Sequence, residues 1–300
     1  MSERSNTRAW DDLLDYRAAG WRKLAYLGSR FSPTFFVKHS PALVGIGFGV
    51  AARRQREMVR ANLRRLLGVR PWQAEEFDIQ RTFIAYAHCL AESLGADRAE
   101  AREARCSVQG QAVLDALIQC KSGFIIGTAH TGGWDIAAQC LLAHSARRVV
   151  LVMGHEADGR AMALHDSIRS RRGVEVVHVG ASALSGLTLL HELKQGAIVA
   201  VQLDRLLPGS RTIEVPLGRL PFSFPRGPFV LASLAQVPLL PLFVARRGFY
   251  EYVVQVGEPA RLPRPLEELQ LSTHAAEVAR QLLTFLLDYP EQWFNFTPDT

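Results

Sequence analysis

The chain has 300 residues, of which 48% are apolar and 21% are charged, the balance of a packed globular protein rather than a disordered one. Its four cysteines, Cys89, Cys106, Cys120 and Cys140, are irregularly spaced, which favours buried thiols in a reducing compartment over a disulfide framework or a zinc site. The formal charge of +6 comes mainly from arginine, which binds phosphate and carboxylate bidentately, so anionic partners are expected.

Residues 1–95 are predicted to form a helical, membrane-facing region. Apolar residues recur at helical spacing from Trp10 to Leu27 and again from Met58 to Leu67. Aromatic and basic residues between Trp21 and Lys38 are compatible with a lipid interface, and equally with helix packing that leaves the arginines solvated. Basic residues are concentrated between 53 and 70, where Glu57 is the only acidic residue. These basic residues are Arg53, Arg54, Arg56, Arg60, Arg64, Arg65 and Arg70.

No segment reaches the roughly 20 apolar residues that a membrane-spanning helix needs. The best candidate, 41–52, is short and contains three glycines. The first residues also lack the basic-then-apolar order of a secretory signal. Any membrane association is therefore expected to be peripheral.

Strands and helices alternate in the rest of the chain. Apolar runs predict strands at 123–129, 148–154, 174–180, 197–203 and 238–245, with helices at 134–142, 161–171, 183–194 and 228–236 between them. An alternating strand at 250–258 is expected to form a hairpin with the preceding strand, and a last helix covers 272–287. We therefore predict an α/β fold with a mostly parallel central sheet flanked by helices, in which residues 96–300 form a core continuous with the helical region.

The hexapeptide 130–135 (HTGGWD) follows the first predicted strand, where α/β sheets bind ligands. Gly132 and Gly133 permit a tight turn and close approach of a substrate, and amides of the next helical turn suit an oxyanion or a phosphate. Asp135 can reach back to orient the imidazole of His130 as a general base. Alternatively, His130 is structural and Asp135 stabilises a helix N-terminus. No metal site is expected, because no third ligand follows a recognisable pattern.

The hexapeptide resembles the H-x4-D/E motif of the lysophospholipid acyltransferase superfamily. Its surroundings resemble the branch of bacterial lipid A biosynthesis (lauroyl and myristoyl) acyltransferases, with phosphatidylinositol mannoside acyltransferases as close relatives. The resemblance covers roughly residues 50–296 and is carried in order by 59–63 (VRANL), 168–173 (IRSRRG), 225–228 (PRGP) and 289–294 (YPEQWF).

This resemblance implies acyl transfer from an acyl carrier protein or coenzyme A thioester to a hydroxyl of a glycolipid or lipid A-like acceptor. His130 would be the general base and Asp135 its orienter, and neither a metal, another cofactor nor nucleic acid is required. The expected location is the cytoplasmic face of the inner (plasma) membrane, bound peripherally.

Substrate-binding roles are expected for a further group of residues, namely Gly132, Gly133, Arg172, Asp204 and Arg226. Asp204 follows the strand 197–203 and would support the histidine, bind acceptor hydroxyls, or simply pair with Arg205. Arg172, together with its neighbours Arg169 and Arg171, and Arg226 would hold phosphates, or else lie solvated at helix ends.

The chain also departs from the family pattern. Gly133 replaces an asparagine, Asp135 replaces a glutamate, the ending 295–300 lacks a basic tail, and no N-terminal spanning helix is evident. The mannoside-type branch, with Asp in the motif and peripheral attachment, fits better on those points, and the acceptor is left open. Two other functions remain to be weighed. One is a peripheral anionic-lipid-binding protein without catalysis; the other is a thioesterase or hydrolase with the same His–Asp pair, for which no G-x-S-x-G elbow is present.

Overall fold

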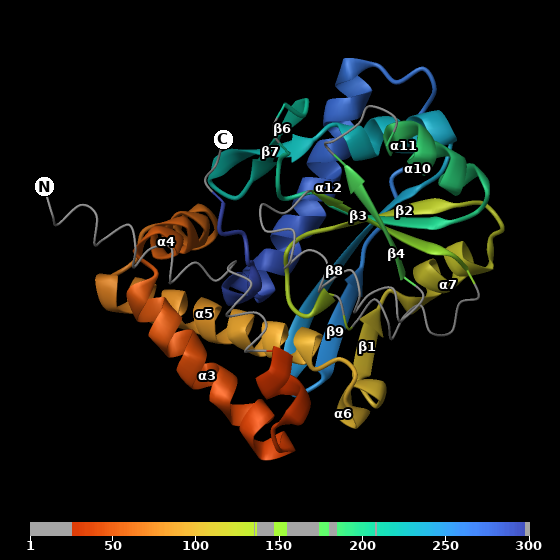
Figure 1. Ribbon diagram of the computed structural model, residues 1–300. Coiled ribbons are helices and arrows are strands. Elements are labelled where there is room, and N and C mark those ends of the chain that lie inside the picture. The colour runs from red at the N-terminus through yellow and green to blue at the C-terminus, as the bar shows by residue number, and fades with distance from the viewer. Residues whose placement is uncertain are drawn as a thin grey trace, which may run out of the picture.

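The computed structural model describes residues 26–134, 136, 147–154, 174–179, 185–207 and 209–297. It confirms the α/β prediction, because helices flank a mostly parallel sheet and a helical region precedes it (Figure 1). Within the described residues the sheet has seven strands in the order β1-β9-β8-β2-β5-β3-β4. Their bounds are β1 (Arg105–Gln109), β2 (Phe124–Thr128), β3 (Val149–Gly154), β4 (Val174–Val179), β5 (Ile198–Gln202), β8 (Leu239–Gly248) and β9 (Glu251–Val256).

The centre of the sheet is parallel and its β8–β9 side is mixed. β2 pairs in parallel with β5 and β8, and β3 pairs in parallel with β4 and β5. β9 runs antiparallel to β8, which confirms the predicted hairpin. β1, which the sequence did not predict, extends the sheet beside β9; its residues RCSVQ are short of apolar side chains and alternate between exposed and half-buried.

The sequence also did not predict a second hairpin, which lies outside the main sheet. β6 (Thr212–Leu217) and β7 (Leu220–Pro225) form a separate antiparallel pair, joined by a turn in which Gly218 has a φ of +70°. Prolines in both strands obscure the period-two pattern that marks a strand. A Cβ atom on Gly218 would lie 2.5 Å from the carbonyl oxygen of Arg65, so the turn needs glycine both for its φ and for this close approach.

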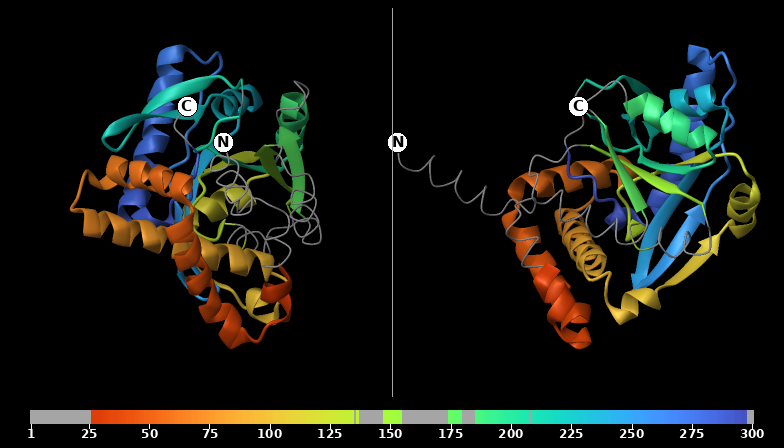
Figure 2. Two further views of the ribbon diagram at one scale, coloured as in Figure 1. Left: turned by 60° about the vertical axis from the view of Figure 1, so that its left-hand side comes forward. Right: turned by 45° about the vertical axis from the view of Figure 1, so that its right-hand side comes forward.

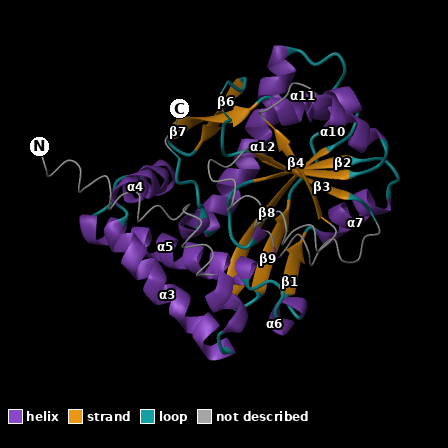
Figure 3. Cartoon of the chain, in the orientation of Figure 1, coloured by secondary structure: helices purple, strands orange, loops and turns teal. Residues whose placement is uncertain are grey.

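Helices lie on both faces of the sheet (Figure 3), and an apolar core is buried on each face. One is shared with α10 (Ser185–Lys194), α11 (Gly227–Ala235) and α12 (Glu268–Asp288), which confirm three predicted helices. The other is shared with α7 (Gln111–Gln119). Along β2, Ile125 belongs to the first core while Phe124 and Ile126 belong to the second, as continuously apolar strands predict.

The N-terminal helices lie together beside the sheet (Figure 2). They are α3 (Thr34–Ala51), α4 (Arg53–Leu67), α5 (Trp72–Leu94) and the short α6 (Ala99–Arg102). α3 packs closely along α5, since a Cβ atom on Gly45 would lie 2.7 Å from the Cα atom of Ile84. Among the described helices none is by itself long and apolar enough to cross a membrane, and only α3 with α4, bent by 95°, meets the length and composition test as a broken pair.

The arginine-rich stretch meets acidic residues on α5, which the sequence did not reveal. Arg64 donates to both carboxylate oxygens of Glu75 at 2.7 and 2.8 Å, while Arg56 and Arg60 pair with Glu76. These pairs bring carboxylates to arginines that the sequence showed opposed by Glu57 alone, so much of the positive charge of the stretch is balanced. Further along the stretch, Arg70 pairs with Asp78 and buried Arg65 donates to the carbonyl oxygens of Leu220 and Pro221.

Several predicted helices lie wholly or partly outside the described residues. The segment 161–171 is entirely outside, and of 134–142 only Trp134 and Ile136 are described. The first predicted helix, up to Leu27, is described only at its last two residues.

Candidate functional site

His130 lies just beyond the carboxyl end of β2, where the chain turns sharply. The turn is made by Gly132, whose φ is +43° and whose N–H donates to the carbonyl oxygen of Gln292 at 3.3 Å. A Cβ atom at this position would lie 2.3 Å from the carbonyl oxygen of Val244. Glycine is therefore required here by conformation and by space, as the sequence indicated.

Asp204 meets His130 because two neighbouring parallel strands end side by side. In the β2–β5 register Thr128 lies opposite Gln202, so the residues two positions beyond each strand end come together. The Oδ1 atom of Asp204 lies 2.8 Å from the Nδ1 atom of His130. Both carboxylate oxygens also accept the backbone N–H of His130, at 3.0 and 3.1 Å. One carboxylate thus fixes both the ring and the backbone of the histidine.

The segment after α12 surrounds this pair, beginning at the 3₁₀ turn η1 (Pro290–Gln292). The indole N–H of Trp293 donates to Oδ2 of Asp204 at 2.9 Å, and the Asn295 side chain donates to the Asp204 carbonyl at 3.0 Å. The N–H of Phe294 donates to the carbonyl oxygen of His130 at 2.7 Å. The sequence marked this segment only through its family resemblance; the fold makes it the outer support of the pair.

Electrostatics keep Asp204 ionised although its side chain is fully buried. Burial raises the pKa of this carboxyl, but the His130 imidazole, Arg205 and the Trp293 indole outweigh it, so the pKa lies below the ordinary value. An ionised Asp204 only accepts hydrogen bonds, so the proton of this contact lies on Nδ1 of His130. The His130 side chain retains 19% exposure, so it is accessible from outside.

The alternative of a simple Asp204–Arg205 salt bridge does not describe this geometry. The guanidinium of Arg205 donates to the carbonyl oxygen of Phe294 at 2.7 Å, and thus also holds the terminal segment. The carboxylate oxygens of Asp204 accept their hydrogen bonds from His130 and Trp293.

The remaining predicted site residues do not all gather here. Gly133 lies in the same turn as Gly132, whereas Asp135 and Arg172 lie outside the described residues. Arg226 stands at the start of α11 and pairs with Glu268 of α12 at 2.7 Å. Within the described part of the chain no three His, Cys, Asp or Glu side chains are grouped as metal ligands would be.

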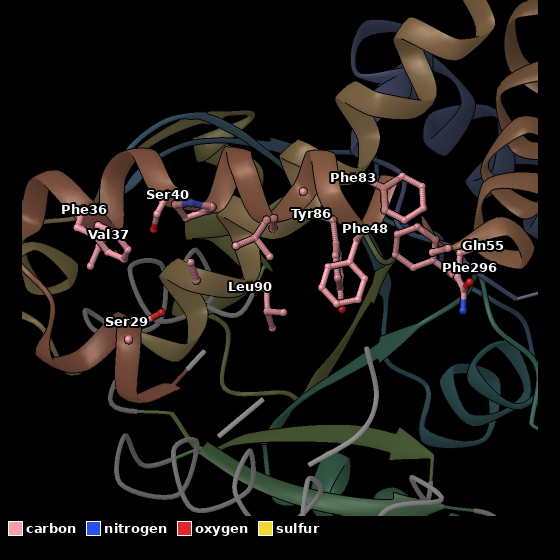
Figure 4. A pocket seen from close by; sticks show the side chains of 17 residues that line it. Ser29, Phe36, Val37, Ser40, Phe48, Gln55, Phe83, Tyr86, Leu90 and Phe296 are labelled. Atoms are coloured by element: carbon pink, nitrogen blue, oxygen red, sulfur yellow. The ribbon is translucent and has the colours of Figure 1, made fainter. Parts of the chain in front are cut away.

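An apolar cavity of about 390 Å³ lies between α3 and α5 (Figure 4). Phe48, Phe83, Tyr86 and Phe296 gather toward one end of it, and Val37 lies toward the other. The aromatic end is connected to the histidine by packing, because Tyr86 packs edge-on against Phe294, whose N–H donates to the His130 carbonyl oxygen. Its volume falls within the range of small-molecule sites.

The described features define an α/β protein with a histidine–carboxylate pair at the carboxyl edge of its sheet and an apolar cavity nearby. Residues 14–299 match the family model of bacterial lipid A biosynthesis acyltransferases, so the chain belongs to that family. A comparison with curated proteins gives no match. Family membership supports the acyltransferase prediction in its general form, with a lipid-type acceptor and an acyl donor as substrates.

Proposed function

We propose that this protein is an O-acyltransferase that moves a fatty acyl chain from an acyl carrier protein or coenzyme A thioester to a hydroxyl of a glycolipid or lipid A-like acceptor. The observation that carries the proposal is the buried Asp204 carboxylate 2.8 Å from Nδ1 of His130. It favours the tautomer in which Nε2 is a base, and the acyltransferase family supplies the reaction class.

In the proposed mechanism Nε2 of His130 removes the proton of the acceptor hydroxyl while its oxygen attacks the thioester carbonyl. The resulting oxyanion would face backbone amides of the turn at Gly133, because the N–H of Gly132 is already used by Gln292. The tetrahedral intermediate then expels the thiolate, which takes the proton from the imidazolium. Asp204 stabilises that imidazolium throughout.

Asp135 remains a second candidate orienter, because the resemblance assigns that role to the acidic residue of the motif. The substitution of each aspartate tells which of them holds the base. Arg172 and Arg226 remain predictions for phosphate binding, and the pairing of Arg226 with Glu268 counts against the latter.

We further propose that the acyl chain lies in the cavity between α3 and α5. This cavity is apolar, and its aromatic end is linked to His130 through Tyr86 and Phe294. Burying a chain there would gain roughly 0.8 kcal/mol per CH₂ group.

The proposed membrane contact uses the outward side of α3. Phe35, Leu43 and Val50 are 77%, 73% and 67% exposed on this helix, an unusual density of large apolar side chains in contact with solvent. Arg53 and Arg54 follow it and make no ion pair among the described residues, so they can meet lipid phosphates. We therefore propose peripheral binding at the cytoplasmic face of the inner membrane, with α3 in the interface.

The test is transfer of a labelled acyl group from acyl-carrier-protein and coenzyme A thioesters to lipid extracts. His130→Ala is expected to lose about 10²–10⁴-fold in rate because the base is gone. Asp204→Asn should approach that loss if it is the main orienter, and Asp135→Asn should do so if the motif aspartate is. Undiminished transfer by His130→Ala would overturn the mechanism.

The same assay separates the alternatives. A thioesterase would release free fatty acid at the same rate without acceptor lipid. A lipid-binding protein without catalysis would float with anionic liposomes yet leave the thioester intact.

A further inference from the structure

A buried carboxylate on α5 has no role in the proposed chemistry. Glu92 is only 1% exposed, and its Oε1 atom accepts the Nε–H of Arg246 at 2.8 Å. Its other oxygen accepts the hydroxyl of Tyr252. Arg246 and Tyr252 are cross-strand partners on β8 and β9, which explains why both reach the same carboxylate. Burial raises the pKa of Glu92, and a buried carboxyl group needs such hydrogen-bonding partners.

The ring of Tyr252 lies directly against the turn that follows His130. A Cβ atom on Gly133 would lie 2.3 Å from Cε1 of Tyr252, so the ring and the backbone are in direct contact at this point. The position of the ring therefore determines how closely the backbone of the turn can pack against the sheet. Glu92, which holds the hydroxyl at the far end of the ring, determines where the ring lies.

The second partner of Glu92 supports the same turn by another route. The Gln292 side chain accepts the backbone N–H of Arg246 at 2.7 Å and donates to its carbonyl oxygen at 2.9 Å. The Gln292 carbonyl in turn accepts the N–H of Gly132. Gly133 is thus in contact with Tyr252, and Gly132 is connected through Gln292 to Arg246. Both Tyr252 and Arg246 bind Glu92.

We infer that Glu92 and Tyr252 are positioning residues for the His130 turn. They make no proposed contact with the substrate. Instead, α5 uses Glu92 on one side to hold the turn, and Tyr86 and Leu90 on another to line the cavity, so one helix connects the two. Misplacement of a reacting group by about 1 Å costs as much as roughly 10²-fold in rate, so a loosened turn lowers turnover. This inference rests on the proposed acyl transfer.

Tyr252→Phe is the informative variant, because it keeps the ring and removes only its link to Glu92. We expect kcat to fall by about tenfold or more with little change in the KM of the thioester, the pattern of a group needed in the transition state. Amide hydrogen exchange in residues 129–134 should become faster, since the turn loses its fixed support.

Tyr250→Phe is the matched control. It also removes a buried hydroxyl that bonds to backbone carbonyl oxygens at the end of α5, those of Gly95 at 3.1 Å and of Glu92 at 3.4 Å. It leaves the Glu92 carboxylate bonded to Tyr252 and Arg246, and the Tyr250 ring is not among the atoms nearest Gly133. The control should lose comparable thermal stability while keeping kcat and the exchange rate at 129–134.

Equal kcat and equal exchange in Tyr252→Phe and the wild type would overturn the inference, as would equal losses in the two tyrosine variants. If the wild type transferred no acyl group, the proposed function would fail instead. The exchange comparison would still decide whether Tyr252 supports the turn.

Discussion

At the scale of single residues, Asp204 joins groups that are far apart in the chain. Two residues beyond the end of β5, it accepts hydrogen bonds from the ring and the backbone of His130 and from the Trp293 indole of the terminal segment. The His130 imidazole and the Trp293 indole both help to hold this buried carboxylate in its ionised form, and in the proposed mechanism that form orients His130 as a base. Loss of any hydrogen-bond donor to Asp204 should therefore also weaken the support of His130.

The variant Trp293→Phe removes one donor and keeps an aromatic ring. It should lower the free energy of unfolding by about 1–3 kcal/mol, because a buried carboxylate oxygen loses a hydrogen bond. Turnover should fall less than in Asp204→Asn, since the His130 contact remains. Urea unfolding and single-turnover rates measure the two effects. A Trp293→Phe protein slower than Asp204→Asn would contradict this ordering.

His88 should make the stability of the fold depend on pH in the acid range. Burial, with Arg246 and His39 nearby, lowers the pKa of His88 from 6.5 to about 4. Between these two pH values the unfolded chain binds a proton at His88 that the folded chain does not bind. The stability that comes from a neutral, buried His88 is therefore fully present above pH 6.5 and is lost as the pH falls toward 4. The variant His88→Gln should show a flatter loss of stability over this range in urea unfolding. Equal slopes in the two proteins would contradict the expectation.

At the scale of elements, α3 and α5 form a unit with a cavity inside and an apolar surface outside. The glycines of α3 let it approach α5, while its large side chains on the other side remain exposed. The inner and outer sides therefore carry separate expectations.

The inner side is tested by Ala87→Phe, which places a ring in the cavity from α5. Long-chain thioesters should lose about tenfold or more in kcat/KM relative to short ones, because a misfit of a single methylene already costs about 1–3 kcal/mol. A series of thioesters of increasing chain length measures this. An unchanged chain-length profile would exclude this cavity as the acyl site.

The outer side is tested by Leu43→Asp and Val50→Asp together. Both side chains are exposed, so the fold should be retained while a charge now opposes entry into lipid. Liposome flotation should show weaker binding than the wild type. The control is Leu269→Asp, which changes a leucine on α12 that is 79% exposed. Equal losses in both proteins would argue against α3 as the contact.

At the scale of the whole molecule, the terminal segment fastens the helical region to the sheet. Trp293 belongs to the sheet core, while Phe294 and Phe296 belong to the core between α4 and α5. Asn62 of α4 also donates to the carbonyl of Asn295 at 2.7 Å. These contacts join α4 and α5 to the segment that supports the sheet, and the continuity of residues 1–95 with 96–300 stays a prediction.

Phe296→Ala tests that continuity. Phe296 packs against Phe83 and Tyr86 with ring centroids 5.7 and 5.0 Å away, so its loss should cost about 3–5 kcal/mol. Fluorescence and far-ultraviolet circular dichroism should still report one shared transition, shifted to lower denaturant. Separate transitions for the helices and the sheet would show that they fold independently.

The sequence by itself determined the fold class, the strands of the parallel core and the turn at Gly132, because apolar runs and glycine positions are local properties of the chain. It also placed His130 and Asp204 at strand ends. Only the tertiary structure decided that they meet, since that depends on β2 and β5 being neighbours in register. The pairing of the arginines with α5 and the link from Glu92 to Gly133 were likewise decided there, because residues distant in sequence meet only through packing.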